Sequence, residues 1–200
     1  MSTVANLHSL PPAARTRRRE PVIPATRLGM WIFLSSEVGT FGGLIAAYVL
    51  MRMWHQEWLH ESAHTLLWIG TINTVVPLTS SLTMVLAHQA AEERDRPRVR
   101  RLLLATVALG VLFLCLKAFE YSHEIHGGHT PRVSVFWSFY FAMTGLHALH
   151  IIGGLVLMLY AITGLRHDCV LRRVAPIGLY WHFVDVVWII LFPLMYVTTH

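Results

Sequence analysis

The chain has 200 residues, of which 54% are hydrophobic and only 14% are charged. A soluble domain usually contains about 25% charged residues. Here five long stretches carry almost no charge and together use more than half of the chain, which excludes a separate water-soluble domain. The net charge of +5 is then expected to mark one side of a membrane, and no nucleic-acid partner is predicted.

The five apolar stretches predict five membrane-spanning helices, because crossing a bilayer takes roughly 20 residues. The predicted spans cover about residues 28–51, 65–87, 102–122, 135–163 and 176–197. We therefore expect an all-α, polytopic membrane protein: a five-transmembrane-helix bundle over residues 28–200, preceded by a basic arm over residues 1–27. Pro176 is expected in the first turn of the last helix, where its missing N–H costs nothing.

Basic residues divide unevenly between the two ends of the predicted helices. Thirteen of the 16 lie before the first span, between the second and third, or between the fourth and fifth, and only Arg52, Lys117 and Arg132 fall at or near the other side. The positive-inside rule then predicts an N-terminus inside and a C-terminus outside. Seven histidines fall on the predicted outer side, where they are interpreted as wet loop residues, with loose metal binding as the alternative: His55, His60, His64, His123, His126, His129 and His200.

The first span contains a buried acid and a stripe of small residues. Glu37 lies nine residues past Leu28, roughly 14 Å along the helix, and an ionisable group at such a depth usually has a functional role. Gly39, Gly43 and Ala47 follow at intervals of four. Such a stripe allows another helix to come close, so we interpret it as a helix-packing face.

Polar residues also lie within the last three spans. His182 and Asp185 are three residues apart in the fifth span, so they share a helix face and are expected to satisfy each other. Trp188 flanks Asp185. His147 and His150 follow Thr144 on one side of the fourth span, and hydrogen bonds between helices are the simplest role for these histidines. Lys117 and Glu120 predict a local ion pair near the outer surface, with a structural role.

The chain has 13 histidines, which are common metal ligands. Haem ligation by His150 and His182 is conceivable, but it requires the two residues to face each other from different helices. Glu61 with His64 and Glu120 with His123 have the Glu-x-x-His spacing of di-iron sites, yet the first pair falls in a loop and the second at a helix end. We therefore expect no metal site and no catalytic residue in this chain.

Several motifs occur in order along the chain: WIFLSSE (31–37), NT (73–74), AH (87–88), EY (120–121), TGLHALH (144–150) and YWHFVDVVW (180–188). With these motifs the chain resembles subunit III of the haem-copper oxidases, in its short five-helix bacterial form, from about Gly29 to Tyr196. The Ser-Glu pair at 36–37 looks like the cytochrome c oxidase branch, because quinol oxidases tend to place Asp at the second position.

The resemblance implies a non-catalytic subunit of a respiratory terminal oxidase in the bacterial plasma (inner) membrane. It implies haem and copper in partner subunits, namely the catalytic subunit I and subunit II, and no redox centre here. It further implies that bound phospholipid, proton uptake and stability of the catalytic subunit depend on this chain. Glu37, His147, His150, His182 and Asp185 match the family's polar motif residues.

Alternatives remain at this point. The same family includes subunits of quinol oxidases and proteins associated with nitric oxide reductases. A stand-alone metal-binding membrane enzyme and a small transporter that relays protons through Glu37 and Asp185 come from other classes. The odd number of helices disfavours the transporter, because it allows no simple inverted repeat.

Overall fold

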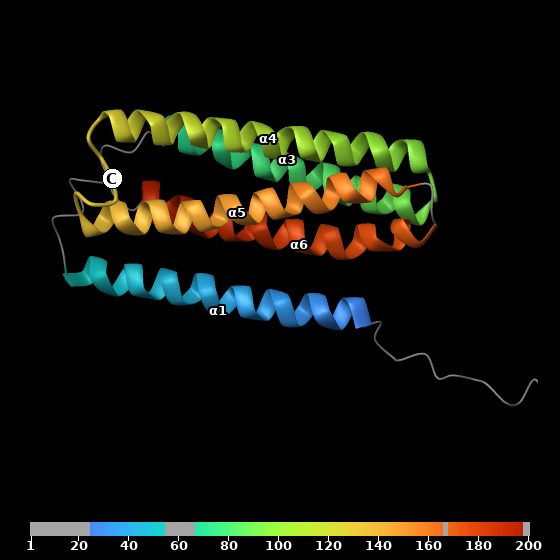
Figure 1. Cartoon of the computed structure of the whole chain (residues 1–200), viewed down its shortest axis with the longest axis horizontal. Coiled ribbons are helices and arrows are strands. Elements are labelled where there is room, and N and C mark those ends of the chain that lie inside the picture. The colour runs from blue at the N-terminus through green and yellow to red at the C-terminus, as the bar shows by residue number, and fades with distance from the viewer. Residues whose placement is uncertain (1–24, 55–66, 166–167, 198–200) are drawn as a thin grey trace, which may run out of the picture.

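The computed structural model describes residues 25–54, 67–165 and 168–197. Within these residues the chain is all helical, and five helices are long and apolar enough to cross a membrane (Figure 1). The expected five-helix, all-α architecture is therefore confirmed. The elements are α1 (Ala25–Trp54), α3 (Leu67–Glu92), α4 (Arg96–His126), α5 (Val135–Thr163), α6 (Asp168–Phe192) and the π-helical turn η3 (Pro193–Val197).

Local capping explains two of the observed helix starts. The limits of α5 match the predicted span, and the Ser134 hydroxyl accepts a hydrogen bond from the Trp137 backbone N–H at 3.4 Å. The α4 helix begins earlier than expected, at Arg96, because Asp95 caps it by accepting from the Arg98 N–H at 3.1 Å. A side-chain oxygen at this position satisfies one of the otherwise unpaired amides of the first turn.

The last helix differs from the prediction at both of its prolines. Pro176 lies inside α6 and not in its first turn, because the helix already begins at Asp168. The carbonyl that loses its partner is four residues earlier, near the helix end, where water can replace the missing donor. At the other end the α-helix gives way to the π-helical η3 at Pro193. Since proline cannot donate to the carbonyl of Ile189, a change of helix register at this residue has a direct cause.

The core lies between α3, α4, α5 and α6, and a tryptophan fills its centre. Trp181 is 2% exposed, and its indole N–H donates to the Ser80 hydroxyl of α3 at 3.0 Å. Two glycines make room for the ring, because a Cβ on Gly154 would lie 2.8 Å from a Trp181 carbon and one on Gly110 would lie 3.0 Å away. One side chain thus joins all four helices.

The α1 helix packs along one side of this bundle, against α6 and α5 (Figure 1). Its buried residues are Leu34, Phe41 and Tyr48, spaced by seven residues. Such a spacing returns to nearly the same helix face after two turns. Much of the remaining α1 surface is exposed, so this helix presents a broad apolar face to its surroundings.

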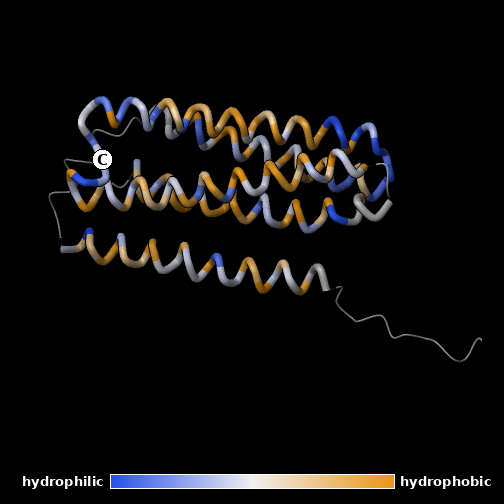
Figure 2. Tube along the Cα trace, in the orientation of Figure 1, coloured by the Kyte–Doolittle hydropathy of each residue, from blue (hydrophilic) through white to orange (hydrophobic). Residues whose placement is uncertain are grey.

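Neighbouring helices run in opposite directions, which brings the start of α4 and the end of α5 to the same end of the bundle (Figure 1). Hydrophilic residues gather there at the start of α4 (Figure 2). They include Arg96, Arg98, Arg100 and Arg101. We call this the arginine-rich end, and it contains the α3–α4 turn. Most of the predicted basic arm over residues 1–27, namely residues 1–24, lies outside the described residues.

Candidate functional site

Glu37 and His150 form a pair between α1 and α5. The Glu37 Oε2 atom lies 3.0 Å from His150 Nε2, and the two side chains are 17% and 12% exposed. These residues are 113 positions apart in the sequence. Each was predicted as a polar site residue, and the structure brings them together.

The hydrogen bond of His150 Nδ1 determines which protons the Glu37–His150 pair carries. His150 Nδ1 lies 2.8 Å from the Leu146 carbonyl oxygen. A carbonyl only accepts hydrogen bonds, so Nδ1 carries a proton and donates it. The contact to Glu37 then needs one more proton, placed either on the carboxyl group or on Nε2. The pair is neutral overall in both arrangements, and a proton can pass between its two atoms without creating net charge.

Aromatic side chains surround this pair. The Phe41 ring lies edge-on to His150, with the ring centres 5.2 Å apart. The Tyr180 hydroxyl of α6 donates to the His150 carbonyl oxygen at 2.8 Å. Helices α1 and α5 thus hold the imidazole, and α6 bonds to the backbone of the same residue. The pair remains partly exposed.

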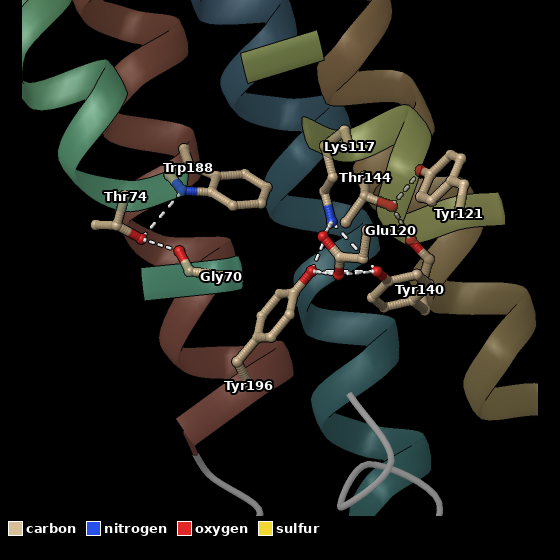
Figure 3. A network of polar contacts seen from close by, with 9 residues as sticks. All are labelled: Gly70, Thr74, Lys117, Glu120, Tyr121, Tyr140, Thr144, Trp188 and Tyr196. Carbon is tan, nitrogen blue, oxygen red and sulfur yellow. Dashed lines mark hydrogen bonds and ion pairs between the residues drawn. The ribbon is translucent and has the colours of Figure 1, made fainter. Parts of the chain in front are cut away.

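A second polar cluster is buried between α4, α5 and η3 (Figure 3). The Lys117 ammonium group donates to Glu120 at 3.1 Å, to the Tyr140 hydroxyl at 3.2 Å and to the Tyr196 hydroxyl at 2.5 Å. Both tyrosine hydroxyls also donate to the Glu120 carboxylate. We refer to Lys117, Glu120, Tyr140 and Tyr196 as the lysine cluster.

The predicted ion pair between Lys117 and Glu120 is present in the lysine cluster, and it is buried inside the bundle. Lys117 is 3% exposed and Glu120 is fully buried. Three N–H donors are all that an ammonium group has, and all three are used. The two tyrosines were missed in the sequence, because tyrosine near the end of a span is usually interpreted as an interfacial residue.

His182 and Asp185 do not satisfy each other as predicted. His182 Nδ1 lies 2.7 Å from the Ser81 hydroxyl of α3. Ser81 also interacts with the Asp185 carboxylate. Trp188, the third residue of this motif, donates to the Thr74 hydroxyl at 3.3 Å. The α6 motif therefore faces hydroxyl groups of α3, which the sequence analysis did not select although serine and threonine recur along that span.

His147 lies in the core, apart from His150. Its ring stacks on Trp188 with the centres 5.2 Å apart and meets the edge of Phe113 at 5.7 Å. Neither ring nitrogen has a hydrogen-bond partner within the described chain. Thr144, on the same helix, instead bonds to the Tyr121 hydroxyl at 2.5 Å. The predicted polar face of α5 is thus divided among three different neighbours.

The small-residue stripe of α1 packs against no helix within the described chain. Gly39 and Gly43 are exposed, and a Cβ added at either would meet nothing within 4 Å. Ala47 is half-buried. The bundle side of α1 is formed by the larger residues described above, so packing of this stripe against another helix stays a prediction.

The described residues contain no group of three or more His, Cys, Asp or Glu side chains that could hold a metal ion. His150 and His182 each have their own partner, as given above, so their geometry does not support a shared haem. On the predicted outer side, His129 pairs with Glu124 at 3.0 Å, while His123 and His126 are exposed. His55, His60, His64, His200 and Glu61 lie outside the described residues.

Comparison with known proteins extends over this whole arrangement. The sequence profile of the family described as "Cytochrome c oxidase subunit III" matches residues 14–200. The chain is 38% identical to "Cytochrome c oxidase subunit 3" of Thermostichus vulcanus over 86% of this chain and 87% of the relative. It is 31% identical to "Probable quinol oxidase subunit 3" of Staphylococcus saprophyticus, over 85% of this chain and 87% of that protein.

A third relative is a longer protein. The chain is 30% identical to "Heme-copper oxidase subunit I+III" of Aeropyrum pernix over 85% of this chain, which corresponds to only 22% of that protein. The profile match includes every described helix and both polar clusters. The chain therefore belongs to the cytochrome c oxidase subunit III family, and it is a multi-pass membrane subunit of a haem-copper oxidase complex.

Proposed function

We propose that this chain is the non-catalytic subunit III of a respiratory terminal oxidase in the bacterial plasma (inner) membrane. The observation that carries this proposal is the profile match over residues 14–200, which includes the Glu37–His150 pair. The proposed partners are the catalytic subunit I and subunit II, which hold the haem and copper. The Aeropyrum pernix protein supports subunit I as a partner, because its name combines subunits I and III.

The proposed orientation has the N-terminus inside and the C-terminus outside. It rests on the arginines at the beginning of α4, which share one end of the bundle with the beginning of α1 (Figure 1). Basic residues flanking membrane helices favour the cytoplasmic side. In this orientation we expect Glu37 within the membrane, because it belongs to the apolar span Leu28–Trp54.

Within the complex, we assign a supporting role to the Glu37–His150 pair: retention of phospholipid beside α1 and support of proton uptake and stability in subunit I. Two features favour this role. The pair is partly exposed, so a polar lipid group or water can reach it. It also contains a proton that can move between carboxyl and imidazole without a change in net charge.

The experiment is the replacement Glu37→Gln, with Glu37→Ala beside it, in the whole oxidase. We expect normal assembly, judged by subunit ratio and haem spectrum, together with less bound phospholipid or an earlier decline of oxygen consumption during turnover. Glu93→Gln is the matched control, because this carboxylate pairs with Arg98 at the α3–α4 turn. Loss of the assembled complex in the Glu37 variants would show instead that the pair is a structural contact.

A quinol oxidase is the second candidate, because a probable quinol oxidase subunit is 31% identical to this chain. We propose cytochrome c as the donor on the basis of Ser36 and Glu37, which resemble that branch. Oxygen consumption by the purified complex with reduced cytochrome c, compared with a quinol, distinguishes the two. The isolated chain is expected to be colourless, and stoichiometric haem or iron in it would contradict a non-catalytic subunit.

A further inference from the structure

An open cavity of about 750 Å³ lies at the arginine-rich end, between the beginning of α4 and the end of α5. Arg96, Arg100 and Arg101 line it from α4, together with Leu104 one turn deeper, and Ile162 lines it from α5. Among the described residues, the walls of the cavity include none from α1. The cavity is thus separate from the Glu37–His150 pair and is not part of the proposed function above.

Over the residues that the structure describes, two arginines of the cavity lack the carboxylate partner that a neighbouring arginine has. Arg98, on the same stretch of helix, pairs with Glu93 at 3.1 Å. In the described part of the chain, no carboxylate lies within ion-pair distance of Arg100 or Arg101. A guanidinium group presents several N–H donors in a plane and binds phosphate oxygens through two of them at once.

The apolar residues that line the cavity indicate which kind of phosphate compound it can bind. Leu104 follows Arg100 and Arg101 by about one helical turn, or about 5 Å deeper along α4. Ile162 adds an apolar side chain from α5, and along α4 the arginines lie toward the end of the bundle while Leu104 lies deeper. A phospholipid has the same order, with a charged headgroup above acyl chains, and basic pockets between membrane helices on the cytoplasmic side bind anionic lipid headgroups.

We infer that the cavity binds one anionic phospholipid, with its phosphate at Arg100 and Arg101 and its acyl chains against Leu104 and Ile162. An inorganic phosphate ion would use the arginines but not the apolar wall. A zwitterionic lipid would use the wall but would bring an additional positive group to the arginines. Both serve as comparisons in the test.

The test measures lipid retained by the purified full-length chain, using native mass spectrometry in mild detergent. Dioleoyl phosphatidylglycerol is compared with dioleoyl phosphatidylcholine, which has the same acyl chains. For Arg100→Gln/Arg101→Gln we expect weaker binding of phosphatidylglycerol by about 5-fold for each arginine, or about 25-fold together. The charge-matched control Arg98→Gln/Arg173→Gln removes two charges outside the cavity and is expected to change binding by less than about 2-fold.

A second variant keeps the charges and fills the cavity. Leu104→Trp adds volume at the apolar wall and is expected to lower phosphatidylglycerol retention as well, which also decides the matter if the double arginine variant fails to fold. Equal retention of the two lipids, equal losses in the control, or unchanged binding in Leu104→Trp would each overturn the inference. Displacement of phosphatidylglycerol by millimolar inorganic phosphate would replace it with a simple anion site.

Discussion

The effect of the lysine cluster on the free energy of unfolding can be predicted quantitatively, because its ion pair is buried while a comparable ion pair lies on the surface. Lys117 and Glu120 are joined at 3.1 Å with their side chains 4% and 0% exposed. Removing one member of a buried pair leaves the other charge without compensation and typically costs about 3–5 kcal/mol. We therefore expect Lys117→Met and Glu120→Gln each to lower the free energy of unfolding by about 3–5 kcal/mol.

The double replacement has a different outcome. In Lys117→Met/Glu120→Gln neither charge remains, methionine fills most of the lysine volume, and the glutamine oxygen still accepts from the hydroxyls of Tyr140 and Tyr196. Those hydroxyls already lie 3.1 Å from each other, so they can also bond together. We expect the double variant to lose only about 1–2 kcal/mol, which is less than either single variant.

The measurement is equilibrium unfolding of the purified chain in mixed micelles with increasing dodecyl sulfate, followed by tryptophan fluorescence. Arg98 and Glu93 provide the matched control, since they are also 3.1 Å apart but 44% and 60% exposed. The same two replacements there are expected to change stability by less than about 1 kcal/mol. Additive losses at Lys117 and Glu120 would refute the reasoning, because they would mean that the two charges do not compensate each other.

Two further predictions use the same unfolding assay. Gly154→Ala should lower the free energy of unfolding by about 1–3 kcal/mol, because its new Cβ would lie 2.8 Å from the Trp181 ring. The control Gly39→Ala, where nothing lies within 4 Å, should change it by less than about 0.5 kcal/mol. Equal effects of the two replacements would contradict the packing of Trp181 against Gly154. Ser81→Ala should cost about 1–3 kcal/mol, because it removes the hydroxyl that links His182 and Asp185, whereas the exposed Thr79→Ala should cost less than about 0.5 kcal/mol.

The number and order of the helices could be predicted from the sequence, because each apolar run is long enough to allow only one interpretation in a bilayer. Helix ends were less predictable. The limits of α5 agree with the prediction, since Ser134 and Gly164 flank the apolar run directly. The α4 helix begins among arginines, which an apolar run does not include, and its start depends on the Asp95 cap.

Site residues could be selected from the sequence, but most of their partners could not. Depth along a helix indicated that Glu37 is buried in the membrane, yet nothing in the sequence specifies which helix α1 faces. His182 illustrates the same limit, because spacing within one helix suggested Asp185 while the contact is to Ser81, 101 residues away. Tyr196 contacts Lys117 from the π-helical turn η3. The helix changes register at Pro193, so the regular α-helical spacing does not predict which way Tyr196 points.

The contacts of α1 bear on how the Glu37 experiment is interpreted. Leu34, Phe41 and Tyr48 are buried against the bundle, and we expect them to keep this packing when Glu37 is replaced. Near the opposite end of the helix from the arginine-rich end, the Tyr48 hydroxyl also donates to the Leu194 carbonyl at 3.4 Å. Packing and hydrogen bonds of this kind hold helices together in lipid, where water supplies no hydrophobic drive. Replacing Glu37 alone should therefore leave α1 in place, so that a change in lipid content or sustained turnover reports on the Glu37–His150 pair itself and not on release of the helix.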